Sequence, residues 1–182
     1  PLPHDAPIPL GKFATLTHCV DANLCHDMLT GHFVTSILTL INKTPGDWYS
    51  KKQNTVKTAT CGSEFVAART CAEQAIDWRN CLRHLGVPIC ERSCMFGDNE
   101  SVVDSSTRPH AKLHKHHLAL SFHHVHEAIA SKIVSFYHIP GDINLANILS
   151  KHWGYQQVWH SLRALLFWSG NLSVLMGDAE DA

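Results

Sequence analysis

With 182 residues, the chain is long enough for one domain whose core needs no disulfide or metal to hold it. Hydrophobic residues make up 45% of the sequence and charged residues 17%, which is typical of a folded globular protein and excludes a disordered one. The formal net charge of −1 excludes a protein that binds nucleic acid by strong positive charge alone, although protonation of some of its 15 histidines would make the balance more positive.

The seven cysteines are odd in number and lack the spacing of a secreted scaffold, and no signal peptide precedes them. We therefore expect reduced thiols and an intracellular location, in the cytoplasm, the nucleus or an organelle. No apolar run approaches the roughly 20 residues that a membrane helix needs, so the sequence predicts no membrane span. The chain begins at Pro1 without an initiator Met, which suggests a fragment or a segment of a longer polyprotein.

Composition also predicts the domain boundaries. Residues 1–11 form a Pro-rich leader or connector, because closely spaced prolines stiffen an extended chain. Residues 12–170 are expected to form a single domain. Residues 171–182 end in small and acidic residues and are expected to be a flexible tail.

Three strands are predicted first. Residues 12–21 alternate between two faces, and residues 33–41 are rich in β-branched residues. A third strand at 47–52 follows a turn signal at Thr44-Pro45-Gly46. Three consecutive strands with short connections favour an antiparallel meander.

The rest of the chain is predicted to alternate between helices and strands. These elements are a helix at 63–85 that Gly86 and Pro88 end, a strand at 94–97, a brief helix at 100–105, a helix at 115–130, a strand at 133–139, a helix from about residue 145 and a last helix at 156–168. The order indicates an α/β fold with a mixed five-stranded sheet, three antiparallel strands followed by helix-crossed strands, flanked by helices.

Three carboxylates fall at the ends of these elements. Asp21 ends the first strand, Glu64 opens the long helix, and Asp98 follows the fourth strand. Taken singly, each is typical of a turn cap or of a helix first turn. Together they can converge on one point, which is costly unless cations neutralise it. Two divalent ions about 3.5–4 Å apart, held by shared carboxylates, are the usual apparatus for phosphodiester hydrolysis.

Five local sequences carry a resemblance to a known family. They are Val20–Asn23 (VDAN), Trp48–Val56 (WYSKKQNTV), Ser63–Ala68 (SEFVAA), Gly97–Ser101 (GDNES) and His138–Lys151 (HIPGDINLANILSK). In this order they resemble the YxDADW, WxSKKQxTV, (T/S)EAEYMA, CDNxS and HxPxxxNxADxLTK motifs of the RNase H domain of copia-type LTR retrotransposon polyproteins. The resemblance extends from about Gly11 to Lys151.

The resemblance implies an RNase H-like fold that binds Mg²⁺ or Mn²⁺, cuts the RNA strand of RNA/DNA hybrids and lies beside a reverse-transcriptase domain. By position, Asp21, Glu64 and Asp98 match three of the family's four acidic metal ligands and catalytic residues. The fourth position reads Asn147, whose neutral amide adds no charge to hold a dication, so we expect weak or no cleavage. Asp142 and Asp104 are possible substitutes, but neither stands at the matching position.

Candidate nucleic-acid contacts follow from the same motifs. They are Lys51, Lys52, Gln53, Lys112 and Lys151. Scattered surface lysines are usually only solvated, and Lys51 and Lys52 rank highest because they belong to a matched motif.

Other positions differ from the family pattern. Cys19, Cys25 and Cys61 stand where relatives commonly carry an aromatic residue. His116 and His126 stand where they tend to carry Lys or Arg. Tyr to Cys, Arg to His and Asp to Asn can each arise from a single transition in a codon. We therefore interpret the chain as a degenerate copy of such an element.

A histidine-rich segment at 110–126 allows two interpretations. Pairs at i,i+3 spacing, such as His114 with His117 and His123 with His126, could hold Zn²⁺ or a similar ion. Cys90 and Cys94 form a C-x₃-C pair upstream, but no second cysteine pair supplies a zinc spacing. The favoured interpretation is therefore a polar helix face that kept a weakened basic surface.

The tryptophans are predicted to be core residues. They are Trp48, Trp78, Trp153, Trp159 and Trp168. Trp159 and the leucines at 162, 165 and 166 are expected to share one face of the last helix, which would offer an apolar surface to a partner if it left its own sheet.

Three functions remain open at this point. The first is a metal-dependent ribonuclease acting on RNA/DNA hybrids during reverse transcription. The second is the same fold, catalytically lapsed, serving as a structural or nucleic-acid-binding subunit of a larger assembly, which Asn147 and the near-zero charge favour. The third is a histidine-cysteine protein that buffers metal.

Overall fold

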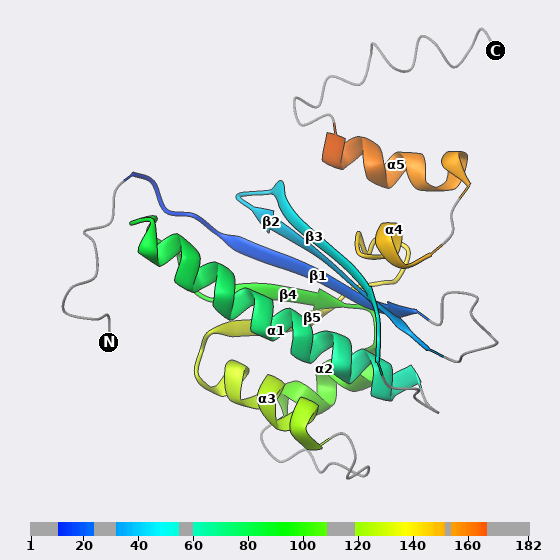
Figure 1. Cartoon of the computed structure of the whole chain (residues 1–182), viewed down its shortest axis with the longest axis horizontal. Coiled ribbons are helices and arrows are strands. Elements are labelled where there is room, and N and C mark those ends of the chain that lie inside the picture. The colour runs from blue at the N-terminus through cyan, green and yellow to red at the C-terminus, as the bar shows by residue number, and fades with distance from the viewer. Residues whose placement is uncertain (1–10, 24–31, 55–59, 109–118, 152–153, 167–182) are drawn as a thin grey trace, which may run out of the picture.

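A five-stranded mixed sheet forms the centre of the molecule, as the sequence predicted, with the strand order β3-β2-β1-β4-β5 (Figure 1). The computed structural model describes residues 11–23, 32–54, 60–108, 119–151 and 154–166. The strands are β1 (Leu16–Asn23), β2 (Val34–Ile41), β3 (Thr44–Lys52), β4 (Ser93–Gly97) and β5 (Val134–His138). The helices are α1 (Thr60–His84), α2 (Glu100–Thr107), α3 (Ala119–Ala130), α4 (Asn147–Ser150) and α5 (Tyr155–Leu166).

The predicted meander of β1, β2 and β3 is antiparallel, and β4 and β5 add to it in parallel. The hairpin between β2 and β3 turns at Asn42 and Lys43, both with positive φ, the conformation that a tight hairpin requires. The prediction of a turn at Thr44-Pro45-Gly46 was therefore wrong, and these residues begin β3. Asn42 tolerates the left-handed backbone, and its side-chain oxygen accepts a hydrogen bond from the Thr15 N–H at 2.8 Å.

The sheet has two differently covered faces (Figure 1). The α1 face carries the alternate residues Val20, Ala22 and Ile37, which pack with α1, α2 and α3 in the main core. The α4 face carries Cys19 and Leu38, which pack with residues of α4 and α5 in a smaller cluster. Because strand side chains alternate, neighbouring residues of β1 and β2 serve opposite faces.

Small residues let α1 lie close to the sheet. Its inner side is made of Ala67, Ala68, Cys71, Ala72 and Ala75, all fully buried. The helix ends as the sequence predicted. Gly86 has a left-handed φ of 72°. The N–H groups of Gly86 and Val87 donate to the carbonyls of the last helical turn, which would otherwise have no hydrogen-bond partner within the helix.

The tryptophan prediction was wrong for Trp48, which is 72% exposed on the edge strand β3. Trp48 stays exposed because β3 is an edge strand and few residues cover the α4 face of the sheet there. Trp78 is partly buried and its indole N–H donates to Asp47 at 3.4 Å. Trp153, Trp168 and the predicted helical residues 115–118 lie outside the described residues. Among the helices that are described, none has the length and apolarity to cross a bilayer.

Candidate metal centre

The pairing of two parallel strands brings Asp21 and Asp98 together. In the register of β1 and β4, Val20 lies opposite Gly97, so the next residue along each strand is an aspartate. The carboxyl ends of parallel strands meet at one edge of the sheet, where side chains of neighbouring strands converge. The closeness of Asp21 and Asp98 is therefore a direct consequence of the strand register.

The first turn of α1 supplies the third carboxylate, Glu64. This turn is tied to the end of β3 by Gln53, whose side-chain amide donates to the Ser63 carbonyl at 3.0 Å and to the Thr35 hydroxyl at 2.9 Å. The Ser63 hydroxyl in turn donates to the Thr60 carbonyl. Gln53 thus fixes where Glu64 lies.

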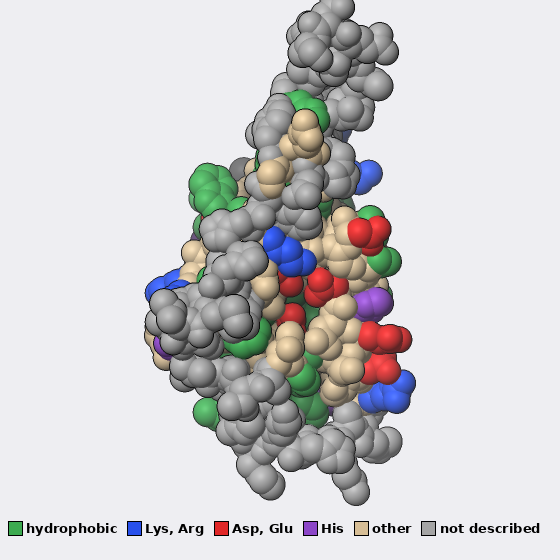
Figure 2. Space-filling model, turned by 90° about the vertical axis from the view of Figure 1, so that its right-hand side faces the viewer, with side chains coloured by type: hydrophobic (Ala, Val, Ile, Leu, Met, Phe, Trp, Pro, Cys, Tyr) green, Lys and Arg blue, Asp and Glu red, His purple; other side chains and the backbone are tan. Residues whose placement is uncertain are grey.

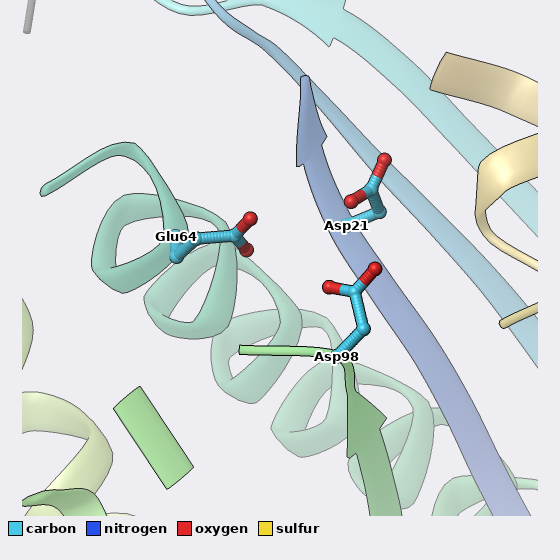
Figure 3. A group of neighbouring side chains, drawn as sticks. All are labelled: Asp21, Glu64 and Asp98. Atoms are coloured by element: carbon cyan, nitrogen blue, oxygen red, sulfur yellow. The ribbon is translucent and has the colours of Figure 1, made fainter. Parts of the chain in front are cut away.

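The three carboxylates face one common space (Figure 3). Ligand oxygens of Asp21, Glu64 and Asp98 lie within 4.8 Å of one another. Asp21 is only 3% exposed and Glu64 8%. Figure 2 shows acidic side chains in a hollow at the centre of one side of the molecule, next to a Lys or Arg side chain. The prediction that these residues converge is consistent with this geometry.

Burial and mutual repulsion make the cluster hard to ionise. Burial raises the pKa of Glu64 to about 9, and the charges of Asp21 and Asp98 add to the effect, against a smaller opposing contribution from Lys151. The pKa of Asp21 is raised mainly by burial, while a hydrogen bond from Ser150 acts in the opposite direction. Such groups store unfavourable energy that a cation would release.

The donor set fits a hard divalent cation. It consists of carboxylate oxygens, which Mg²⁺ and Mn²⁺ prefer over the nitrogen and sulfur ligands of zinc. Within the described part of the chain, no other group of three or more acidic, histidine or cysteine side chains has a metal-binding arrangement. His123 and His126 therefore do not form such a group with any other described residue, and His114 and His117 lie outside the described residues.

Asn147 lies at the start of α4, beside the cluster. Its side chain is buried, and its amide N–H donates to the Gly141 carbonyl. Gly141 itself lies against Asp98, since a Cβ added there would come within 3.0 Å of the Asp98 Oδ2. Through Gly141, Asn147 thus lies near Asp98, and it brings an amide instead of a carboxylate to this side of the cluster.

Hydrogen bonds rather than a large apolar interface attach α4 to the sheet. The Asn144 amide donates to the Val20 carbonyl at 3.0 Å, and the Asn23 amide donates to the Ser150 carbonyl at 3.3 Å. The Ser150 hydroxyl donates to Asp21 itself. The sequence analysis missed Asn144 and Ser150 as site residues, although both lie within the closing motif that it had matched.

His138 is a further residue near the site that the sequence analysis did not single out. Its Nε2 lies 3.2 Å from the backbone carbonyl of Asp98, and its side chain is exposed at the end of β5. It was visible as the first residue of the closing motif, but nothing in the sequence distinguished it from the other 14 histidines.

The remaining predicted site residues have different positions. Lys51 and Lys52 are exposed on β3, whereas Gln53 is 6% exposed and its amide serves the α1 contact described above. Lys151 follows α4, close enough to act electrostatically on Asp21 and Glu64. Lys112 lies outside the described residues. Of the possible substitute acids, Asp104 pairs with Arg108 on α2 and Asp142 is exposed, and neither joins the cluster.

No protein-family model matches the chain. Among solved structures it is similar to the N-terminal RNase H domain of rv2228c from Mycobacterium tuberculosis, with 12% identity over 83% of this chain and 98% of that one and a TM-score of 0.55. It is also similar to LC11-RNase H1, isolated from compost by a metagenomic approach, with 15% identity, coverage of 81% and 98%, and a TM-score of 0.54. The same protein in complex with an RNA/DNA hybrid matches at 15% identity, with coverage of 75% and 92% and a TM-score of 0.55.

The chain therefore has an RNase H-like fold, and its acidic cluster lies at the carboxyl ends of the central strands. At these identities the likeness establishes the fold alone. The expected fold class is confirmed.

Proposed function

We propose that this chain is an RNase H-like domain derived from a copia-type retrotransposon, built to cleave the RNA strand of RNA/DNA hybrids and weakened by Asn147. The observation that carries the proposal is the convergence of Asp21, Glu64 and Asp98 within 4.8 Å in an RNase H-like fold. The matched motifs supply the copia-type origin. The structure of LC11-RNase H1 with an RNA/DNA hybrid supports the choice of substrate.

The three carboxylates would hold Mg²⁺ or Mn²⁺. When bound, such ions supply an activated water and neutralise the charge that develops on the leaving oxygen of the phosphodiester. Asp21 and Glu64 are buried and so have little freedom to turn away from the site. Asn147 leaves one carboxylate fewer than the family pattern, which reduces the negative charge available to the cation and so the stabilisation of the transition state.

Lys51, Lys52 and Lys151 are the proposed backbone contacts for the hybrid. Lys51 and Lys52 border a cavity of about 230 Å³ between β3 and α1, which Asn54 and Thr70 also line. Lysines neutralise phosphates without reading the base sequence. Gln53 contributes by holding the first turn of α1, and Lys112 remains a prediction from sequence. An adjacent reverse-transcriptase domain would supply further positive surface.

An intracellular location fits the state of the cysteines. The cysteines in the described ranges are free thiols, at positions 19, 61, 71, 81, 90 and 94. Free thiols persist in a reducing compartment.

The decisive experiment compares the natural chain with Asn147→Asp on a labelled RNA/DNA hybrid in Mg²⁺ and in Mn²⁺. We expect slow cleavage by the natural chain and an increase of about 10- to 100-fold with Asn147→Asp, because the variant restores the fourth carboxylate. Asn80→Asp, which adds the same charge at an exposed site on α1, is the matched control and leaves the rate unchanged. Asp21→Asn abolishes cleavage and excludes a contaminating nuclease.

A second candidate function is a catalytically lapsed module that serves as a structural or nucleic-acid-binding subunit of a larger assembly. The amide at position 147, hydrogen-bonded to the Gly141 carbonyl, favours it, because a carboxylate cannot donate that bond. Absence of cleavage by both the natural chain and Asn147→Asp, with hybrid binding retained, would establish this second function. Equal cleavage by both would show that Asn147 does not weaken the site.

A further inference from the structure

The residues around α4 point to an unusual metal stoichiometry. We infer that this centre holds one divalent ion instead of two, because α4 and the residue after it provide Asn147, Ser150 and Lys151, where two ions would need more negative charge and a shared carboxylate. The inference rests on the proposed function and goes beyond it, since it concerns how many ions the natural chain binds with or without cleavage.

Charge balance is the first argument. Four carboxylates would match the charge of two dications, whereas this cluster has three. Lys151 adds a positive charge that acts on both Asp21 and Glu64. The ionised cluster together with Lys151 therefore has two net negative charges, which is the charge that one dication neutralises. A second dication would enter a site that already has no net charge.

The second argument concerns Asp21, the buried aspartate near the carboxyl end of the central strand β1. A carboxylate that bridges two ions offers one oxygen to each. The Ser150 hydroxyl donates to the Asp21 Oδ2, and Ser150 is itself only 1% exposed. A second ion on this oxygen would have to compete with a hydroxyl that has little room to move. Ser150 thus acts as a positioning residue that leaves the other oxygen of Asp21 for the first ion.

The backbone around Ser150 is fixed independently of the metal. The Asn23 amide donates to the Ser150 carbonyl at 3.3 Å, and the Ser50 hydroxyl donates to the adjacent Leu149 carbonyl at 2.9 Å. Both donors come from strands of the sheet. The serine is therefore held in place against Asp21 before any ion binds, which is how an outer residue orients a metal ligand.

Asn147 removes the remaining route to a second ion. Its amide N–H is directed to the Gly141 carbonyl, next to Asp98. An amide has no charge to contribute to a second ion, and its N–H is already engaged by this contact.

The test is a titration of the metal-free chain with Mn²⁺, without nucleic acid, followed by the electron paramagnetic resonance of free Mn²⁺ and by calorimetry. We expect one equivalent to bind, with any second ion at least about 100-fold weaker. The double variant Asn147→Asp/Lys151→Gln gives the cluster four negative charges and no compensating lysine, so it binds two equivalents. Asn80→Asp/Lys12→Gln changes the same residue types at exposed sites outside the cluster and keeps one equivalent.

Variants of Ser150 test the positioning role. Ser150→Ala weakens binding of the single ion by about 10-fold and broadens the spectrum of bound Mn²⁺, because Asp21 loses its fixed orientation. Ser150→Thr keeps the hydroxyl and restores both properties, which loss of packing alone would not explain. Ser131→Ala, at an exposed serine after α3, has no effect. Circular dichroism confirms that each variant is folded.

The result separates this inference from the proposed function. One bound ion supports the inference whether or not the hybrid is cleaved. Two ions of similar affinity in the natural chain overturn it, even if cleavage is found and the proposed function stands. Failure to bind any Mn²⁺ overturns it as well.

Discussion

The two faces of the sheet are held in different ways. On the α1 face, three helices cover a continuous core in which Ile37 and Met95 are fully buried. On the α4 face, a short helix is attached largely by hydrogen bonds from strand and loop residues, and a cavity of about 390 Å³ lies among Leu38, Trp48 and the leucines of α4 and α5. The acidic cluster lies where the two faces meet.

This difference also separates the ways in which the residues of the candidate site are held. Asp21 stands on β1, Glu64 stands on α1 and Asp98 directly follows β4, and all three elements contribute residues to the main core. Asn147 stands on α4, on the other face, where its side-chain amide donates to the Gly141 carbonyl. We therefore expect substitutions on the α4 face to cost less stability than substitutions on the α1 face.

The largest expected effect compares adjacent residues of β2. Ile37→Ala, on the α1 face, should lower the free energy of unfolding by about 2–5 kcal/mol, because it leaves a cavity in a closely packed core. Leu38→Ala, on the α4 face, should cost only about 1–2 kcal/mol, because Leu38 already borders a cavity and has fewer neighbours to lose. Urea unfolding of both variants measures the difference. Equal losses would show that the two faces are equally well packed.

The next effect concerns His18, a buried histidine on the α1 face. Its Nδ1 lies 3.0 Å from the Thr39 hydroxyl, its Nε2 has no hydrogen-bond partner among the described residues, and burial lowers its pKa to about 4. Between pH 6.5 and 4, the His18 imidazole is protonated in the unfolded chain and neutral in the folded chain. The stability contributed by neutral His18 is therefore complete above pH 6.5 and is lost as the pH falls towards 4, by up to about 3 kcal/mol.

Urea unfolding at pH 7, 6, 5 and 4 measures this loss. His18→Gln removes the titrating group but can still bond Thr39, so its stability should depend less on pH than that of the natural chain in this window. The matched control is His84→Gln, which makes the same substitution at an exposed position. If the free energy of unfolding depends on pH in the same way for the natural chain and for His18→Gln, the α1 face tolerates a buried charge.

A smaller effect is expected at Glu64, in the acidic cluster. Substitution of Glu64 should raise the free energy of unfolding without a cation, and it should reduce the stabilisation that a cation gives. The raised pKa of Glu64 means that its ionisation opposes folding as the pH rises from about 4.5 towards 9. In a chelator at pH 8, Glu64→Gln should therefore stabilise the chain, by on the order of 1–3 kcal/mol. With Mg²⁺ at 100 times its dissociation constant, the natural chain should gain about 2.7 kcal/mol and the variant much less.

Thermal unfolding with and without Mg²⁺ measures both changes in stability. Gln74→Glu, at a partly buried position on the same helix, controls for a change between amide and carboxylate away from the cluster. A Glu64→Gln variant that is less stable in both conditions would mean that Glu64 serves the fold and not a cation.

The sequence predicted much of the α1 face and less of the α4 face, for a physical reason. The order of strands and helices and the convergence of Asp21, Glu64 and Asp98 follow from periodicity, from the ends of strands and from the matched motifs. The position of Trp48 did not follow, because an aromatic residue in a strand indicates burial only if something covers that side of the sheet. The contact of Ser150 with Asp21 links residues 129 positions apart, and no local pattern records such a pair.

The smallest expected effect tests how little the outer part of the α4 face contributes. Trp48→Ala should change the free energy of unfolding by less than about 1 kcal/mol, because most of the side chain is already in water and its removal exposes little new apolar surface. The control is Trp78→Ala, whose partly buried indole bonds Asp47 and should cost more. Urea unfolding decides between them, and a loss at Trp48 as large as at Trp78 would mean that α5 closes over the cavity more tightly in solution. Since Leu162 and Leu165 line that cavity, α5 would then belong to the folded core and not to its margin.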